Sequence, residues 1–98
     1  MYMENEMQNK NEMTTRDIYL ASTLTTLRFN MTRISFQVEG ASGKPVGYFS
    51  FENTPELREA ERDYWQSRLA VEPRAFVTSL RGLKAQLTNY YKSPYSTH

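Results

Sequence analysis

The chain has 98 residues, a formal net charge of +1 and no cysteine. A chain of this length is expected to form one domain, and the lack of cysteine excludes disulfides, thiolate metal sites and cysteine nucleophiles. Because the sequence shows neither a secretory signal pattern nor an apolar stretch of transmembrane length, we expect a cytoplasmic protein without membrane contact.

Residues 1–13 are expected to form a disordered tail. They are mostly Glu, Asn, Gln and Met without an apolar period, so they bury too little surface to offset the entropy of ordering them. Met13 is an alternative start, because every recognisable signal follows it. Residues 92–98 are expected to fray, which leaves a single domain over residues 14–91.

The first predicted element is a helix over about residues 15–28. Thr14 or Thr15 is its expected N-cap. Apolar side chains recur along it at spacings of three and four, which is typical of a helix with one buried face. These side chains are Leu20, Leu24 and Leu27, with Ile18 and Ala21 alongside.

Two antiparallel strands joined by a turn are predicted next. Residues 32–40 alternate between polar and apolar side chains, which is typical of a strand with one buried face. Gly40 and Gly43 suit a turn, and residues 45–52 return as the partner strand. The side chains expected to face the core are Ile34, Phe36 and Val38 in the first strand and Phe49 and Phe51 in the second.

A second helix is predicted to begin with Thr54 as N-cap and Pro55 in its first turn. Its expected apolar line runs through Leu57, Ala60 and Tyr64, extended by Trp65. Charged residues of both signs lie between these positions, three and four residues apart, which is typical of a solvent-exposed helix face.

The same charged run offers an alternative, a magnesium site formed by Glu56, Glu59 and Asp63. Arg58 and Arg62 lie among these carboxylates and would compete for their oxygens. We therefore favour the solvent-exposed face.

Residues 69–71 are a candidate for a very short third strand, before Pro73 opens the last helix. Five apolar side chains of this helix fall within a sector of about 80°. They are Phe76, Leu80, Leu83, Leu87 and Tyr90. The expected fold is α+β, with the helices packed on one face of the hairpin.

The sequence gives no pattern of catalytic residues. The only histidine is His98, the last residue, which removes the commonest general base and metal ligand. Ser50, Ser67 and Ser79 therefore have no histidine partner, and no glycine-rich phosphate loop is present. We expect a protein that is not an enzyme and holds no cofactor or metal.

The charge distribution along the chain is uneven. Residues 73–98 carry four cations and no acid, a net charge of +4, whereas residues 1–17 carry four acids against two cations, a net charge of −2. An acid-free C-terminal helix suggests an anionic partner.

On a helical wheel Arg81 and Lys92 fall within about 20° of Arg74, and Lys84 lies about 80° away. The apolar sector is centred about 160° from the line of Arg74, Arg81 and Lys92, so a positive stripe stands opposite the buried face and can follow a phosphate backbone of DNA or RNA. Arg33 is a further candidate contact, and the residues that can stack on bases are Tyr90, Tyr91 and Tyr95. The alternative is an ordinary solvated helix.

Tyr19, Tyr48 and Trp65 suggest another role. Exposed together, they could anchor a partner protein, although aromatic side chains also supply bulk in the core of a small domain. The alternative function is therefore a protein-binding modulator of a host or phage factor, or a homodimeric module, without nucleic-acid contact.

Four short motifs resemble those of a small phage and bacterial family catalogued as a domain of unknown function. They are RDIYLA at residues 16–21, FSF at 49–51, LAVEP at 69–73 and LK at 83–84. The likeness spans about residues 14–91. It implies a phage or mobile-element setting, hence the host cytoplasm, and it implies no activity and no catalytic residue.

Overall fold

The computed structural model describes residues 11–41 and 43–92, with the backbone alone for positions 39, 91 and 92. Its elements are β1 (Glu12–Thr15), α2 (Ile18–Thr26), β2 (Met31–Glu39), β3 (Lys44–Glu52), α3 (Pro55–Trp65) and α4 (Pro73–Lys92). The three strands form one antiparallel sheet in the order β1-β3-β2. The predicted α+β class is confirmed.

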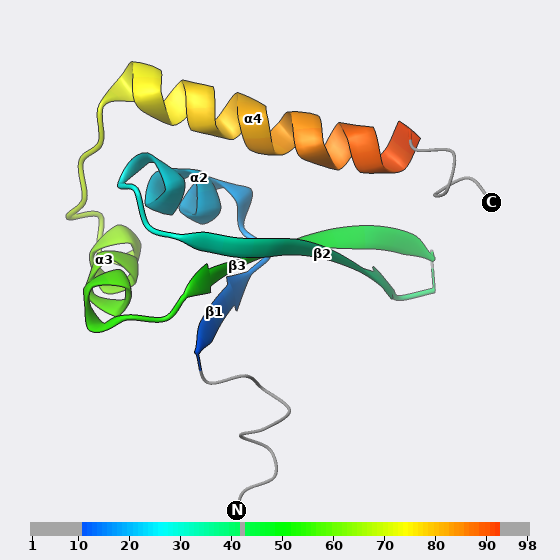
Figure 1. Ribbon diagram of the computed structural model, residues 1–98, viewed down its shortest axis with the longest axis horizontal. Coiled ribbons are helices and arrows are strands. Elements are labelled where there is room, and N and C mark those ends of the chain that lie inside the picture. Colours follow the sequence, from blue (N-terminus) through cyan, green and yellow to red (C-terminus); the bar gives the residue numbers. More distant parts are fainter. Residues whose placement is uncertain (1–10, 42, 93–98) are drawn as a thin grey trace, which may run out of the picture.

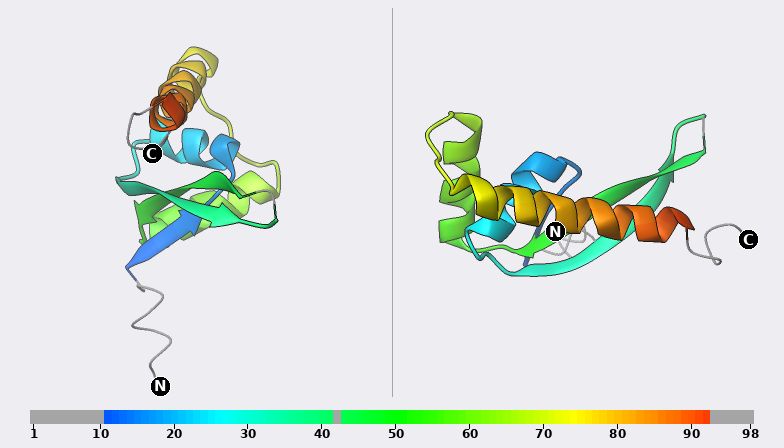
Figure 2. Two further views of the ribbon diagram at one scale, coloured as in Figure 1. Left: turned by 90° about the vertical axis from the view of Figure 1, so that its right-hand side faces the viewer. Right: turned by 90° about the horizontal axis from the view of Figure 1, so that it is seen from above.

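The elements form layers on one side of the sheet. Figure 1 shows α2 between α4 and the sheet, with α3 beside the end of the sheet. In the views of Figure 2, α4 runs lengthwise above the β2–β3 hairpin. The opposite face of the sheet carries no helix among the described residues.

The third strand is not where the sequence suggested. Residues 68–72 form no strand. The third strand of the sheet is β1, which pairs with the end of β3 so that Met13 lies opposite Phe51. The expected tail is therefore wrong for Glu12 and Met13, while residues 1–10 lie outside the described part. A four-residue strand with one apolar side chain shows no period, so sequence patterning cannot reveal it.

The hairpin follows the predicted alternation with one exception. Ile34 lies opposite Phe49, and Phe36 opposite Gly47, while Phe49 and Phe51 are buried. Val38 was expected in the core but is 69% exposed. Its position in the register is on the helix side, yet it lies near the hairpin tip, which projects well past α2 (Figure 1).

The predicted apolar side of α4 does face the domain. Leu83 is 4% exposed within the core cluster, and Leu87 packs against that cluster. Further along, the Tyr90 ring stacks on Phe36 with centroids 3.6 Å apart and planes 7° from parallel. Gly47 permits this close approach, because a Cβ there would lie 2.6 Å from Leu87 Cδ2.

Helix α2 is shorter than predicted at both ends. Asp17 caps it rather than Thr14 or Thr15, because its Oδ1 accepts hydrogen bonds from Tyr19 N at 2.9 Å and Leu20 N at 3.2 Å. The helix ends in a Schellman motif, with Arg28 at a φ of 72° and Phe29 N donating to Leu24 O. Thr54 caps α3 as predicted, since its Oγ1 accepts from Leu57 N.

Ser22 of α2 is fully buried, and its Oγ has no hydrogen-bond partner among the described residues. An unsatisfied buried hydroxyl typically costs about 1–3 kcal/mol, and alanine has the higher helix propensity. We expect Ser22→Ala to raise the free energy of unfolding by about 1 kcal/mol, measured by urea titration.

The matched control is Thr26→Ala, also on α2. The Thr26 hydroxyl donates to Ser22 O at 2.7 Å and shares a second hydrogen bond with the Ser79 hydroxyl, its Oγ 3.0 Å away, so its loss should destabilise the domain. A Ser22→Ala variant less stable than the parent would contradict an unpaired hydroxyl at this position.

Candidate nucleic-acid interface

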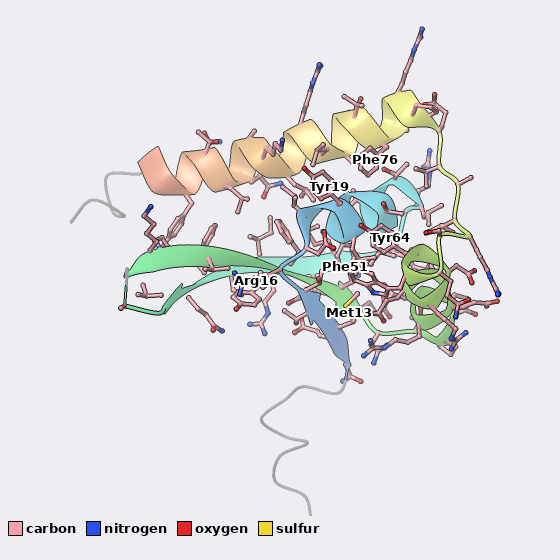
Figure 3. The ribbon with its side chains drawn as sticks, turned by 180° about the vertical axis from the view of Figure 1, so that it is seen from behind. Met13, Arg16, Tyr19, Phe51, Tyr64 and Phe76 are labelled. Carbon is pink, nitrogen blue, oxygen red and sulfur yellow. The ribbon has the colours of Figure 1, made fainter. Side chains whose placement is uncertain are left out.

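Two cations of α4 lie opposite its apolar side, and a third lies at the flank of that side. Arg74, Arg81 and Lys84 are all exposed, and we call them the basic stripe. In Figure 3, long side chains that end in nitrogen project from the outer side of this helix. Helix α4 has 20 residues and contains no aspartate or glutamate, so no carboxylate within the helix can neutralise its cations.

No carboxylate pairs with the basic stripe in the part of the chain that the structure describes. Arg58 of α3, by contrast, lies 2.8 Å from a Glu61 oxygen and also donates to Asn53 Oδ1. Among the described residues, α4 therefore carries positive charges without a carboxylate partner, whereas α3 carries charges of both signs.

The α3 charged run is a solvent-exposed face, as favoured from the sequence. Arg58, Glu59 and Arg62 are exposed. Among residues 11–41 and 43–92, no three carboxylate or histidine side chains lie close enough to share a metal ion. The magnesium alternative at Glu56, Glu59 and Asp63 therefore gains no support.

The members of the basic stripe differ in their surroundings. Glu72 accepts hydrogen bonds from Arg74 N at 3.1 Å and from Ala75 N at 2.8 Å, so a carboxylate already occupies the N-terminal end of α4. Arg81 lies about 10 Å further along the axis, away from that carboxylate. Arg81 is therefore the central cation of the stripe.

Two other residues that were predicted to contact nucleic acid, Arg33 and Tyr90, interact with other parts of the domain. Arg33 pairs with Glu12 at 3.1 Å. Its register position opposite Ser50 places it on the sheet face away from the helices, since the flanking Phe49 and Phe51 face α2. Tyr90 stacks on Phe36 of the hairpin, so its ring is engaged within the domain.

The remaining candidates fall at the end of the described region. Lys92 is the last residue of α4, but its side chain lies outside the described atoms, as does that of Tyr91. Tyr95 also lies outside the described residues.

The predicted aromatic group is divided between two surfaces. Tyr48 is half-buried opposite Ser35, on the open face of the sheet. Tyr19 and Trp65 are 52% and 60% exposed. Trp65 was expected to extend the apolar line of α3, but it lies one position, about 100°, beyond Tyr64 and faces solvent.

The proximity of Asp17 and Tyr19 to Tyr64 was not predicted from the sequence. Burial raises the pKa of the Tyr64 hydroxyl, and the charge of Asp17 and then Tyr19 raise this pKa further. The start of α2 and the end of α3 are thus brought together, and only the packing of the two helices could reveal this.

Comparisons with known proteins assign no family. The chain matches no protein-family model, and no curated protein or solved structure matches it significantly. The resemblance to a phage and bacterial family stays a prediction. None of the helices in the described residues is long and apolar enough to span a bilayer.

Proposed function

We propose that this chain is a small non-enzymatic accessory protein that contacts nucleic acid through the basic stripe of α4. The observation that supports this most is the set of exposed α4 cations that have no carboxylate partner among residues 11–41 and 43–92, on a helix whose opposite side is buried. Such a helix is held rigidly by its apolar side and offers its charged side to a phosphate backbone.

The expected binding is weak and nearly independent of sequence. Phosphate contacts carry no base information, and three cations release few counterions. For duplex DNA we expect a slope of about −3 for log K against log salt concentration. By the resemblance described above, the setting is a phage or mobile element in the host cytoplasm.

Fluorescence anisotropy of a labelled DNA oligonucleotide, single-stranded and duplex, tests the proposal. Arg81→Glu removes the central cation and adds a repulsive charge, so we expect affinity at low salt to fall at least tenfold and the salt slope to become shallower by about 1. RNA of the same sequence shows whether the contact distinguishes the two sugars.

Arg68→Glu is the matched control, since Arg68 is exposed in the loop before α4 and is not part of the stripe. It makes the same charge change and should alter the affinity much less. No binding at low salt, or equal losses for both variants, would remove the support for α4 as the contact surface.

A protein partner is the second candidate function, favoured by the exposure of Tyr19 and Trp65. On this alternative the protein is a modulator of a host or phage factor, or forms a homodimer, with no nucleic-acid contact. Size-exclusion chromatography with light scattering distinguishes the homodimer from a monomer.

A further inference from the structure

Strand β2 is the last strand of the sheet and runs along the margin of the molecule. The order β1-β3-β2 leaves no strand of the described residues on its outer side, and β3 is the one described element with extensive contacts to it. Figure 2, in the view from above, shows the first half of β2 outside the line of α4. A further strand can therefore be added at this edge of the sheet.

The backbone groups of β2 that point outward follow from two hydrogen bonds of β3. Glu52 N donates to a carbonyl just before β2, whereas Asn53 N donates to one just before β1. Since backbone groups point alternately to the two sides of a strand, the even-numbered residues of β3 bond to β2. Within residues 33–39, their partners in the register are the odd-numbered residues. The N–H and C=O groups of Ile34 and Val38 therefore point away from β3.

The two outer edges of the sheet differ in their protection against strand addition. Strand β1 pairs only with the end of β3, so no described strand flanks residues 44–48 on that side. This stretch contains Lys44 and Pro45, and lysine and proline are residues by which natural sheets block the addition of a strand. Strand β2 contains neither, and its register is regular from Arg33 to Glu39. The edge of β2 is therefore the one suited to pairing.

The sequence of this edge is complementary to itself in the antiparallel direction. Residues 33–39 read RISFQVE. An antiparallel copy centred on Phe36 places Arg33 opposite Glu39, and it places aliphatic opposite aliphatic and polar opposite polar. These further pairs are Ile34 with Val38 and Ser35 with Gln37. Opposite charges and β-branched side chains make favourable cross-strand pairs.

We propose that this protein forms a homodimer in which the β2 strands of two copies pair antiparallel about a two-fold axis beside Phe36. Two three-stranded sheets then join into one sheet of six strands. The outward backbone groups of Ile34 in one copy and Val38 in the other come opposite each other, as a hydrogen-bonded pair requires. The pairing also explains Val38, which is 69% exposed in the single chain and is covered by the second copy in the dimer.

The intrachain contacts of the two charged residues are compatible with this pairing. One terminal nitrogen of Arg33 donates to Glu12 at 3.1 Å, and a guanidinium has five N–H donors, so it can bind a second carboxylate. Glu39 lies opposite Lys44 in the register. A second cation across the outer edge adds attraction of the same sign.

The dimer places both copies of α4 on one face of the joined sheet. The residues of β2 that pair across the axis at positions 34, 36 and 38 all lie on the helix side in both copies. The two basic stripes then face the same way, and one duplex can contact both. This last consequence rests on the proposed function, whereas the dimer itself does not.

Sedimentation equilibrium of the full chain, without nucleic acid, measures the association. Pairing over residues 33–39 gives a small interface, so we expect a dissociation constant on the order of 10 µM. The mass should rise from that of one chain at about 1 µM toward that of two chains at about 300 µM. Because no DNA is present, this result is independent of the anisotropy titration.

A charge exchange tests the register. Arg33→Glu and Glu39→Arg each place like charges opposite each other twice in the dimer, so each alone should weaken association about tenfold or more. The double variant restores opposite charges in both pairs and should return the dissociation constant to within about threefold of the parent. Arg68→Glu, in the exposed loop before α4, is the matched control and should change it less than about twofold.

Val38→Pro tests the backbone pairing. The N–H of Val38 points outward, so proline there leaves the bonds between β2 and β3 in place and removes a donor from the outer edge. We expect this variant to be folded by far-UV circular dichroism and monomeric at about 300 µM.

Three outcomes would overturn the proposal. A parent chain that stays monomeric up to about 300 µM has no such interface. A dimer that persists in Val38→Pro does not use the backbone of this edge. A dimer that the double charge exchange fails to restore is held together in another register or by another surface.

Discussion

Replacing Leu83 with aspartate should lower the free energy of unfolding by about 4 kcal/mol or more, a large part of the stability of this domain. Leu83 is the most deeply buried described side chain of α4, at 4% exposure, and belongs to the core cluster with Leu20 and Leu24 of α2. The change removes buried apolar surface and places an unpaired charge there, at a cost of about 4 kcal/mol or more. A domain of this size has only about 4–12 kcal/mol of stability.

Far-UV circular dichroism and a urea titration measure the effect. Lys84→Asp is the matched control, because the next residue is exposed and receives the same side chain, so its cost should stay below about 1 kcal/mol. A Leu83→Asp variant as stable as Lys84→Asp would mean that α4 does not pack on α2, and the outward orientation of the basic stripe would lose its basis.

The elements with strong periodicity were predictable from the sequence. The apolar spacing of α4, the alternation of β2 and the Thr54-Pro55 start of α3 all depend on neighbours within one element. In each case the local preference and the tertiary packing agree. Such agreement is the usual condition for an interpretation from pattern alone to succeed.

How the elements pack against one another could not be predicted from the sequence in the same way. Arg33 and Arg81 both appear as exposed cations in the sequence, but the register of β2 on β3 places Arg33 on the face opposite the helices. Helical-wheel geometry relates residues within α4 and says nothing about β2. The outward position of Arg74, Arg81 and Lys84 was accordingly predictable, whereas the separation of Arg33 from them was not.

The packing of α2 against α3 shows the same limit. Tyr64 follows Leu57 by seven residues and therefore lies on the buried line of α3, while Trp65 does not. The proximity of Asp17 to Tyr64 depends on how α2 packs on α3. A short-range pattern cannot fix that packing, because it arises from the whole core.

Met13→Ala should lower the free energy of unfolding by about 2–5 kcal/mol, the usual cost of truncating a buried methionine. Met13 is 4% exposed and pairs with Phe51, which is itself fully buried. Its side chain is the one described apolar group that β1 gives to the core, so its loss also weakens the pairing of β1 with β3. A urea titration with unchanged m-value gives the difference directly.

Met13→Leu is the matched control, because it keeps nearly the same volume and should cost less than about 1.5 kcal/mol. This pair of variants separates two views of the N-terminal region. If residues up to 13 were only a tail, both changes would leave the stability within about 0.5 kcal/mol of the parent. A large loss for alanine and a small loss for leucine would instead show that β1 completes the sheet, because only a side chain packed inside the core is sensitive to its volume.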